Sequence, residues 1–179
     1  MIGVTWYEAN AYCRWLTEKL RQGKNPSCIL PPSSFVRLPT KSEWVRAAGG
    51  DANKRYVWDK SEIENPASKI ENVLARANVK ESGLEGTTPV AMYLDGARVV
   101  YESVLLSEWN DPRPSKQLIF DLAGNVWEWT SDLYEPYSAA HLRGGSWYNG
   151  AESVCASARN SRYYRESDDD NGLRVVAAL

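Results

Sequence analysis

Residues 121–130 read Asp121-Leu122-Ala123-Gly124-Asn125-Val126-Trp127-Glu128-Trp129-Thr130. Turn residues open this stretch, and its second half, from Asn125 to Thr130, is short and rich in tryptophan, which favours a strand. A similar pattern recurs from Leu142 to Trp147, and an apolar run of strand character follows from Gly172 to Leu179. The C-terminal third is therefore predicted to consist of short strands joined by turns.

The N-terminal segment is predicted to form a helix. Thr5 and Glu8 have the Ser/Thr-x-x-Glu spacing of a capping box, in which each side chain bonds a backbone amide of the first turn. Apolar residues recur at three- and four-residue spacing from Trp6 to Leu20, and Gly23 and Pro26 follow as stop signals.

A second, shorter helix is predicted by another capping box at Thr40 and Glu43, and it ends at Gly49-Gly50. From about residue 51 to residue 120 the helical period disappears. We expect loops there, with short strands at Thr88–Leu94 and Ala97–Tyr101. Two early helices followed by short strands and long loops predict an α+β fold.

Length and composition predict one soluble domain over residues 1–179. The 21 Lys and Arg against 23 Asp and Glu give a net charge of −2, which provides no basic field for nucleic acid. No run approaches the roughly 20 apolar residues that cross a bilayer, so we expect no membrane insertion and leave the cellular location open. The cysteines Cys13, Cys28 and Cys155 lack metal-ligand spacing, and the lone His141 is given no role.

Five segments stand out in order along the chain: Val4–Ala9 with Ala11–Trp15, Arg37–Trp44, Asp121–Thr130, Arg143–Trp147 and Asn171–Val175. Together they resemble the formylglycine-generating, or sulfatase-modifying, enzyme family. The resemblance implies a C-type-lectin-like fold with two helices, short antiparallel strands and many loops. It also implies that the N-terminal part of the family domain is missing, because members carry further strands before the first segment.

The same resemblance implies where a copper ion would bind. Family enzymes oxidise a substrate cysteine with copper held by two cysteines that follow the Gly-Gly-Ser motif, and copper(I) requires such soft thiolate ligands. Here the first position is Asn149, the second falls near Ala151, and Cys155 is the one thiol in the region. We therefore expect no copper, no catalytic residues and no oxidase activity.

Calcium is implied by the resemblance at Asn125 and Glu128, since side-chain oxygens from one tight loop suit this hard cation. The alternative is that Glu128 bonds loop amides while the neighbouring tryptophans pack. A second family calcium site has Ser82 where an aspartate is usual, with contributions expected from Asn72 and the Val73 carbonyl.

Residues 146–174 are predicted to form a variable ligand-binding segment. From Ser157 to Asn171, ten of fifteen residues are Asn, Ser, Tyr or Asp, a composition typical of antibody contact loops. The segment also resembles the variable proteins of diversity-generating retroelements, in which mutagenesis of Asn codons yields Tyr, Ser and Asp. The predicted ligand-binding residues are Tyr148, Asn149, Glu152, Asn160, Ser161, Tyr163, Tyr164, Ser167, Asp168, Asp169 and Asp170, with Arg159, Arg162 and Arg174 as framework.

Three functions stay open at this point. The first is a non-catalytic variable protein that binds a protein or glycan on another cell or a virus. The second is a binding or accessory domain without diversification, and the third is a copper oxidase acting on sulfatase cysteines. The first requires the Tyr and Asp side chains to be exposed, above buried side chains of Trp127, Trp129, Trp147 and Val175.

Overall fold

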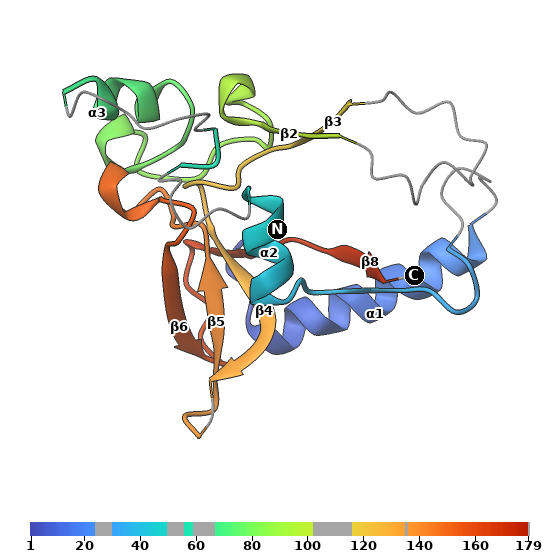
Figure 1. Cartoon of the computed structure of the whole chain (residues 1–179). Helices are drawn as coiled ribbons and strands as arrows, with labels where there is room; N and C mark the ends of the chain where they lie inside the picture. The colour runs from blue at the N-terminus through green and yellow to red at the C-terminus, as the bar shows by residue number, and fades with distance from the viewer. Residues whose placement is uncertain (24–29, 50–55, 59–66, 102–115, 135, 179) are drawn as a thin grey trace.

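The computed structural model describes residues 1–23, 30–49, 56–58, 67–101, 116–134 and 136–178 (Figure 1). Its centre is a four-stranded sheet in the order β6-β5-β4-β7. These strands are β4 (Trp127–Tyr134), β5 (Ala139–Arg143), β6 (Arg159–Tyr163) and β7 (Asn171–Leu173). β5 is antiparallel to both of its neighbours, whereas β7 pairs with β4 in parallel.

The described residues form two smaller sheets as well. β1 (Phe35–Arg37) pairs with β8 (Val176–Ala178), and β2 (Arg98–Tyr101) pairs with β3 (Lys116–Ile119), both antiparallel. The first pair brings residues near the two ends of the chain together beside the first helix (Figure 1). The short antiparallel strands implied by the family resemblance are therefore present, with the β4–β7 pairing as a parallel exception.

Both predicted helices form, and both begin at their capping boxes. α1 (Trp6–Gln22) follows Thr5 and α2 (Lys41–Ala47) follows Thr40, and in each the reciprocal bonds with the glutamate three residues later are present. A third helix, α3 (Ala67–Leu74), was not predicted. Its eight residues lie in the region assigned to loops, although Asn65-Pro66 before them is a helix-start pattern and Ile70, Val73 and Leu74 have helical spacing. The described residues also form the short 3-10 turns η2 (Lys80–Ser82), η3 (Leu94–Gly96) and η5 (Ala151–Ser153).

Backbone conformation corrects several predicted strand boundaries. β4 starts two residues later than expected because Asn125 has φ of 64°, a left-handed conformation that a strand does not accept. β5 ends at Arg143, since Gly144 and Gly145 have φ of 96° and 77° and turn the chain. The expected strand at Thr88–Leu94 is wrong, because turns and η3 occupy it.

The C-terminal strands also differ from the prediction. The apolar run from Gly172 is divided into β7 and β8 on either side of Arg174 and Val175. β6 lies within the segment that composition had assigned to contact loops. Its polar residues gave no apolar alternation, so the strand could be found only from its pairing with β5.

One face of the central sheet packs on α1. Trp129, Leu142 and Ala140 lie on this face with no exposed surface, against Ala9 and Cys13 of the helix. The indole of Trp129 donates a hydrogen bond to the Val4 carbonyl at 2.9 Å, so this large ring is buried without an unpaired N–H group.

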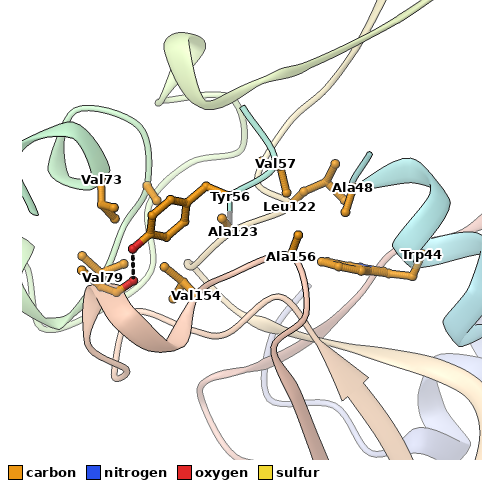
Figure 2. Close-up of a cluster of buried hydrophobic side chains, with 12 residues drawn as sticks. Trp44, Ala48, Tyr56, Val57, Val73, Val79, Leu122, Ala123, Val154 and Ala156 are labelled. Carbon is orange, nitrogen blue, oxygen red and sulfur yellow. Dashed lines mark hydrogen bonds between the residues drawn. The ribbon is translucent and has the colours of Figure 1, made fainter. Parts of the chain in front are cut away.

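A second core joins α2 to the loops around α3 and η5 (Figure 2). Trp44, Tyr56, Leu122 and Val154 are its large members, and the Tyr56 hydroxyl donates to the Ala151 carbonyl at 3.0 Å. The Gly124 turn is packed so closely here that a Cβ atom would lie 2.3 Å from the Asn78 carbonyl oxygen. Glycine is therefore required at this turn both for its φ of 72° and for space.

These elements confirm the predicted α+β, C-type-lectin-like fold with many loops. No helix in the described part of the chain combines the length and apolar character needed to cross a bilayer. Pro26, Cys28 and Gly50, which entered the sequence predictions, lie outside the described residues.

Candidate ligand-binding surface

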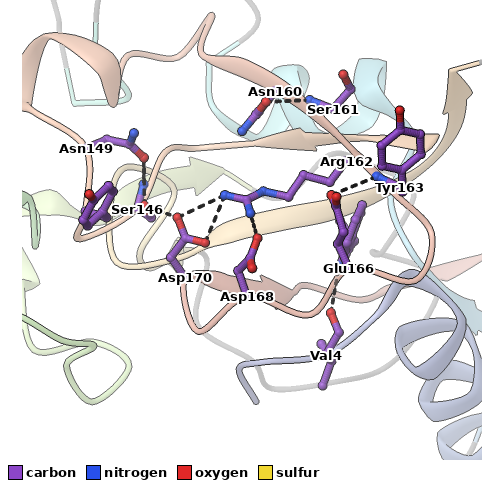
Figure 3. A network of polar contacts seen from close by, with 12 residues as sticks. Val4, Ser146, Asn149, Asn160, Ser161, Arg162, Tyr163, Glu166, Asp168 and Asp170 are labelled. Atoms are coloured by element: carbon purple, nitrogen blue, oxygen red, sulfur yellow. Dashed lines mark hydrogen bonds and ion pairs between the residues drawn. The ribbon is translucent and has the colours of Figure 1, made fainter. Parts of the chain in front are cut away.

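A polar network holds the segment between β5 and β7 in place (Figure 3). The Ser146 hydroxyl lies 2.9 Å from Asp170 Oδ2 and 2.8 Å from Asn149 Oδ1. Arg162 on β6 donates to Asp170 Oδ1 at 3.2 Å and also forms an ion pair with Asp168. The Asp170 carbonyl in turn accepts the Trp127 amide at 2.8 Å, so the network is fastened to the start of β4.

Three of the predicted ligand-binding residues make supporting contacts within the fold. Asp170 is only 6% exposed and acts as a buried acceptor. Asn149 is half-buried and closes the turn on Ser146. Tyr164 is half-buried too, with its ring centroid 5.2 Å from Trp6 and 5.7 Å from Tyr7 on α1. These side chains position the segment and do not face outward.

The other predicted residues are mostly exposed. Tyr148 is 65% and Tyr163 58% exposed. The side chains of Glu152, Ser161, Ser167, Asp168 and Asp169 are exposed as well, whereas Asn160 is half-buried. Of the residues expected beneath them, Trp127 and Trp129 are buried, but Trp147 and Val175 are only half-buried.

β6 forms the outer edge of the central sheet, and its edge is not open. The outward amide of Ser161 donates to Asn160 Oδ1 at 2.8 Å, and that of Tyr163 donates to Glu166 Oε2 at 3.1 Å. Side chains therefore satisfy two of the amides that an added strand would need. The structure presents the side chains of this strand, rather than its backbone, for contact.

The sheet face opposite α1 brings the predicted residues Asn160 and Ser161 together with Tyr134 and His141, to which the sequence assigned no role. Tyr134, His141, Arg159, Asn160 and Ser161 line a shallow hollow of about 460 Å³. Burial and the charges of neighbouring cations lower the pKa of His141, so it is neutral near pH 7. No motif marks this face, and only the pairing of β5 with β6 brings these residues together.

Glu128 faces α2 instead of the Asn125 loop. It is 4% exposed, and its carboxylate accepts from Trp44 Nε1 at 2.6 Å and from Arg174 Nη2 and Nε at 2.6 and 2.9 Å. Burial lowers the pKa of Arg174, but the charge and hydrogen bonds of Glu128 more than offset this and raise it. A guanidinium thus occupies both oxygens of Glu128, so this carboxylate does not fit a calcium ion here.

Asn125 is committed to protein partners as well. Its Oδ1 accepts the Thr88 amide at 2.9 Å and an Asn78 side-chain hydrogen at 3.3 Å. At the second implied calcium site, the Ser82 hydroxyl accepts the Val79 amide at 3.1 Å. Asn72 Oδ1 is buried without a protein partner, so its contribution to a calcium site stays a prediction. Across the described residues, no three His, Cys, Asp or Glu side chains gather as a metal site.

The positions that resemble the copper ligands hold no thiol. Asn149 bonds Ser146, and Ala151 is buried at the start of η5. Cys155 is half-buried with its sulfur 3.2 Å from the Ser157 hydroxyl, and Cys13 is a buried free thiol whose pKa is raised by that burial. The described residues therefore do not fit the two-thiolate site that copper(I) requires.

Comparisons with known proteins identify the family of the chain. The model of the sulfatase-modifying factor enzyme 1-like domain matches residues 1–179. Inactive C-alpha-formylglycine-generating enzyme 2 of Mus musculus is 28% identical over 155 residues, covering 85% of this chain and 39% of that protein. The formylglycine-generating enzyme of Streptomyces coelicolor is 29% identical over 201 residues, covering 98% of this chain and 52% of that protein. The chain thus spans between 39% and 52% of the length of these relatives.

Two solved structures share the fold. Treponema denticola variable protein 1 has a TM-score of 0.64 at 20% identity, with 99% of this chain and 70% of that chain covered. PvdO from Pseudomonas aeruginosa has a TM-score of 0.62 at 18% identity, with 98% and 60% covered. At these identities the likeness concerns the fold alone. Because the family model spans its whole length, the chain belongs to the sulfatase-modifying factor enzyme 1-like, or formylglycine-generating enzyme, family.

Proposed function

We propose that this chain is a non-catalytic ligand-binding domain whose contact surface lies between residues 146 and 174. The observation that carries this proposal is the division of that segment into two sets of side chains. Ser146, Arg162 and Asp170 bond one another and hold the backbone. The exposed set, which we name the display surface, consists of Tyr148, Glu152, Ser161, Tyr163, Ser167, Asp168 and Asp169.

Diversification of the display surface is part of the proposal. Its Tyr, Ser and Asp residues are what mutagenesis of Asn codons leaves. Their side chains are exposed, and among them Asp168 also forms an ion pair with Arg162. The fold shared with a variable protein of Treponema denticola supports this origin at the level of the fold. A reverse transcriptase gene beside this gene, with a near-copy of its 3′ end, is the expected finding. A neighbouring sulfatase gene with neither feature would count against diversification.

The alternative is the oxidase activity that names several relatives. Asn149 and Ala151 stand where that chemistry needs cysteines, and the relative from Mus musculus is named as inactive. With copper, oxygen and a sulfatase peptide that contains its cysteine, we expect no aldehyde by mass spectrometry. Aldehyde formation that is lost in Cys155→Ser would show an enzyme and overturn the proposal.

The ligand is proposed to be a protein or glycan on another cell or a virus. Screening the chain against arrays of surface proteins and glycans should give a binder, and Tyr163→Ala should abolish that binding because exposed aromatic anchors are frequent hot spots. Trp15→Ala, at a 52% exposed residue of α1, is the control and should bind normally. A ligand that binds Tyr163→Ala as well as the unaltered chain would contradict the proposed surface.

A further inference from the structure

The sheet face opposite α1 carries a cluster of cations on a chain with a net charge of −2. Arg143 on β5 and Arg159 on β6 lie directly opposite each other, and Lys41 and Arg46 of α2 line an adjoining hollow with Arg143. The nearby carboxylate of Asp132 accepts the Lys41 amide at 2.5 Å and lies 4.0 Å from its Nζ atom. The carboxylate of Asp132 is therefore already paired with Lys41.

The two arginines oppose each other at a cost to the folded chain. The backbone amides of Ser161 and Tyr163 point away from β5. Arg159 lies two residues before Ser161 on the same strand, so its amide points the same way, and Arg159 and Arg143 form a non-hydrogen-bonded pair of the two strands. Side chains are closest in such pairs, and like charges directly opposite are destabilising. Burial and then the charge of Arg159 lower the pKa of Arg143, which reflects the same repulsion.

The hydrogen-bonding capacity of the pair is only partly used. Arg143 Nη1 donates to the Ser157 and Ala158 carbonyls at 3.3 and 3.2 Å, but its Nε is buried without a partner. Arg159 was expected as framework, yet it is exposed and has no hydrogen bond or ion pair to any other described residue. The pair therefore retains donors and charge for an external anion.

Aromatic rings extend this face beyond the arginines. The rings of Tyr134 and Tyr137 stack with centroids 5.1 Å apart, and Tyr134 also contacts His141 at 5.2 Å. Both tyrosines are about half exposed, at 43% and 56%. A second hollow of about 310 Å³ lies next to the first and shares Tyr134 and Ser161 with it. Cationic and aromatic contacts therefore form one continuous, shallow surface.

We propose that this basic face, formed by Lys41, Arg46, Tyr134, Tyr137, Arg143 and Arg159, binds an acidic loop of a protein partner. Guanidinium groups pair with carboxylates in a bidentate way, and Arg and Tyr are the side chains enriched in protein interfaces. The shallow hollows suit a protein surface better than a small molecule, which needs a deep pocket. The capped edge of β6 excludes a partner that adds a strand.

This inference rests on the proposed function, because the basic face adjoins the display surface at Ser161 and Tyr163. Arg159 lies within the segment 146–174, whereas the other residues of the basic face lie outside it, where diversification would leave them unchanged. The basic face would then attract acidic proteins in general, while the display surface selects among them. Electrostatic attraction of this kind weakens as salt increases.

The test uses the whole chain with a capped octaglutamate peptide as the probe and octaglutamine as the neutral control. Octaglutamate should bind at about 20 mM salt and much more weakly at about 300 mM. Arg159→Gln should weaken binding about fivefold, as expected for one exposed ion pair, and Arg159→Glu should abolish it. Arg14→Gln removes an exposed arginine of α1 and should leave binding unchanged. Circular dichroism confirms that each variant is folded.

Octaglutamate binding that is absent, or that Arg159→Glu leaves intact, would overturn the inference. So would equal or tighter binding of hyaluronan with the same dependence on Arg159, since the face would then suit an acidic glycan. The two proposals fail separately. If a screened ligand requires Tyr163 but binds independently of Arg159 and of salt concentration, only this inference is wrong. If octaglutamate binds through Arg159 but no ligand depends on Tyr163, only the proposed function is wrong.

Discussion

Replacing Glu128 by Gln tests the buried network that joins β4, α2 and the C-terminal segment. The carboxylate has 5% and the Arg174 side chain 25% exposed surface, and their closest contact is 2.6 Å. Glutamine keeps the shape but removes the charge, which leaves a mostly buried guanidinium uncompensated. Breaking such a pair costs about 3–5 kcal/mol, and the partial exposure of Arg174 places the expected loss near 3 kcal/mol. For a chain of this size, that loss lowers Tm by roughly 6–12 °C.

Urea and thermal unfolding, followed by tryptophan fluorescence, measure this loss. Glu18→Gln is the matched control, because its ion pair with Arg21 is exposed and should contribute at most about 1 kcal/mol. A loss for Glu128→Gln no larger than that of Glu18→Gln would refute the role assigned to the network. Calcium should not change the Tm of the unaltered chain through Glu128. A calcium-dependent increase that disappears in Glu128→Gln would instead make this residue a metal ligand.

Four further substitutions test the core, the display surface and the cap of α2. Trp129→Ala removes a ring with 0% exposure and should cost roughly 3–5 kcal/mol in urea unfolding, so a loss below about 1 kcal/mol would contradict its place in the core. Tyr163→Ala should change the free energy of unfolding by less than about 0.5 kcal/mol, whereas Tyr164→Ala should lower it by about 1–3 kcal/mol because the Tyr164 ring packs on α1. Equal losses would argue against the division into supporting and exposed side chains. Hydrogen bonds from Arg37 and the Thr40 amide hold the pKa of Glu43 at about 2, so its stabilising effect is present above about pH 4.5 and is lost as pH falls towards 2. Glu43→Gln should therefore flatten the loss of Tm in acid, and an unchanged acid profile would refute this assignment.

Local sequence signals predicted the parts of the fold that local chemistry determines. The capping boxes at Thr5 and Thr40 place both helix starts, because the bonds they make lie within one turn. α3 and β6 were missed for different reasons. α3 is a short helix in a stretch rich in Gly, Pro and Asn, even though Asn65-Pro66 before it is a start signal. β6 exists through hydrogen bonds to β5, from which a loop and η5 separate it in the sequence. Such pairing is not visible in the residues of one strand.

The candidate site was predictable in composition but not in orientation. A run of Asn, Ser, Tyr and Asp looks uniform in sequence, yet the fold turns Tyr163 outward and Tyr164 towards α1, as strand alternation requires. Asp170 and Asp169 divide in the same way, because only Asp170 reaches Ser146 and Arg162. The basic face was missed, since its residues come from α2, β4, β5, β6 and the turn between β4 and β5.

The central claim, an exchangeable display surface on a fixed frame, is tested most directly by comparing two libraries displayed on yeast. One library randomises Ser161, Tyr163 and Asp169, and the other randomises Ser146, Arg162 and Asp170. Folding is measured by protease resistance, and binding by selection against one chosen surface protein. We predict that most members of the first library fold and that some bind, whereas most of the second are lost to unfolding. Equal loss of folding in both libraries, or a folded first library without binders, would contradict the claim.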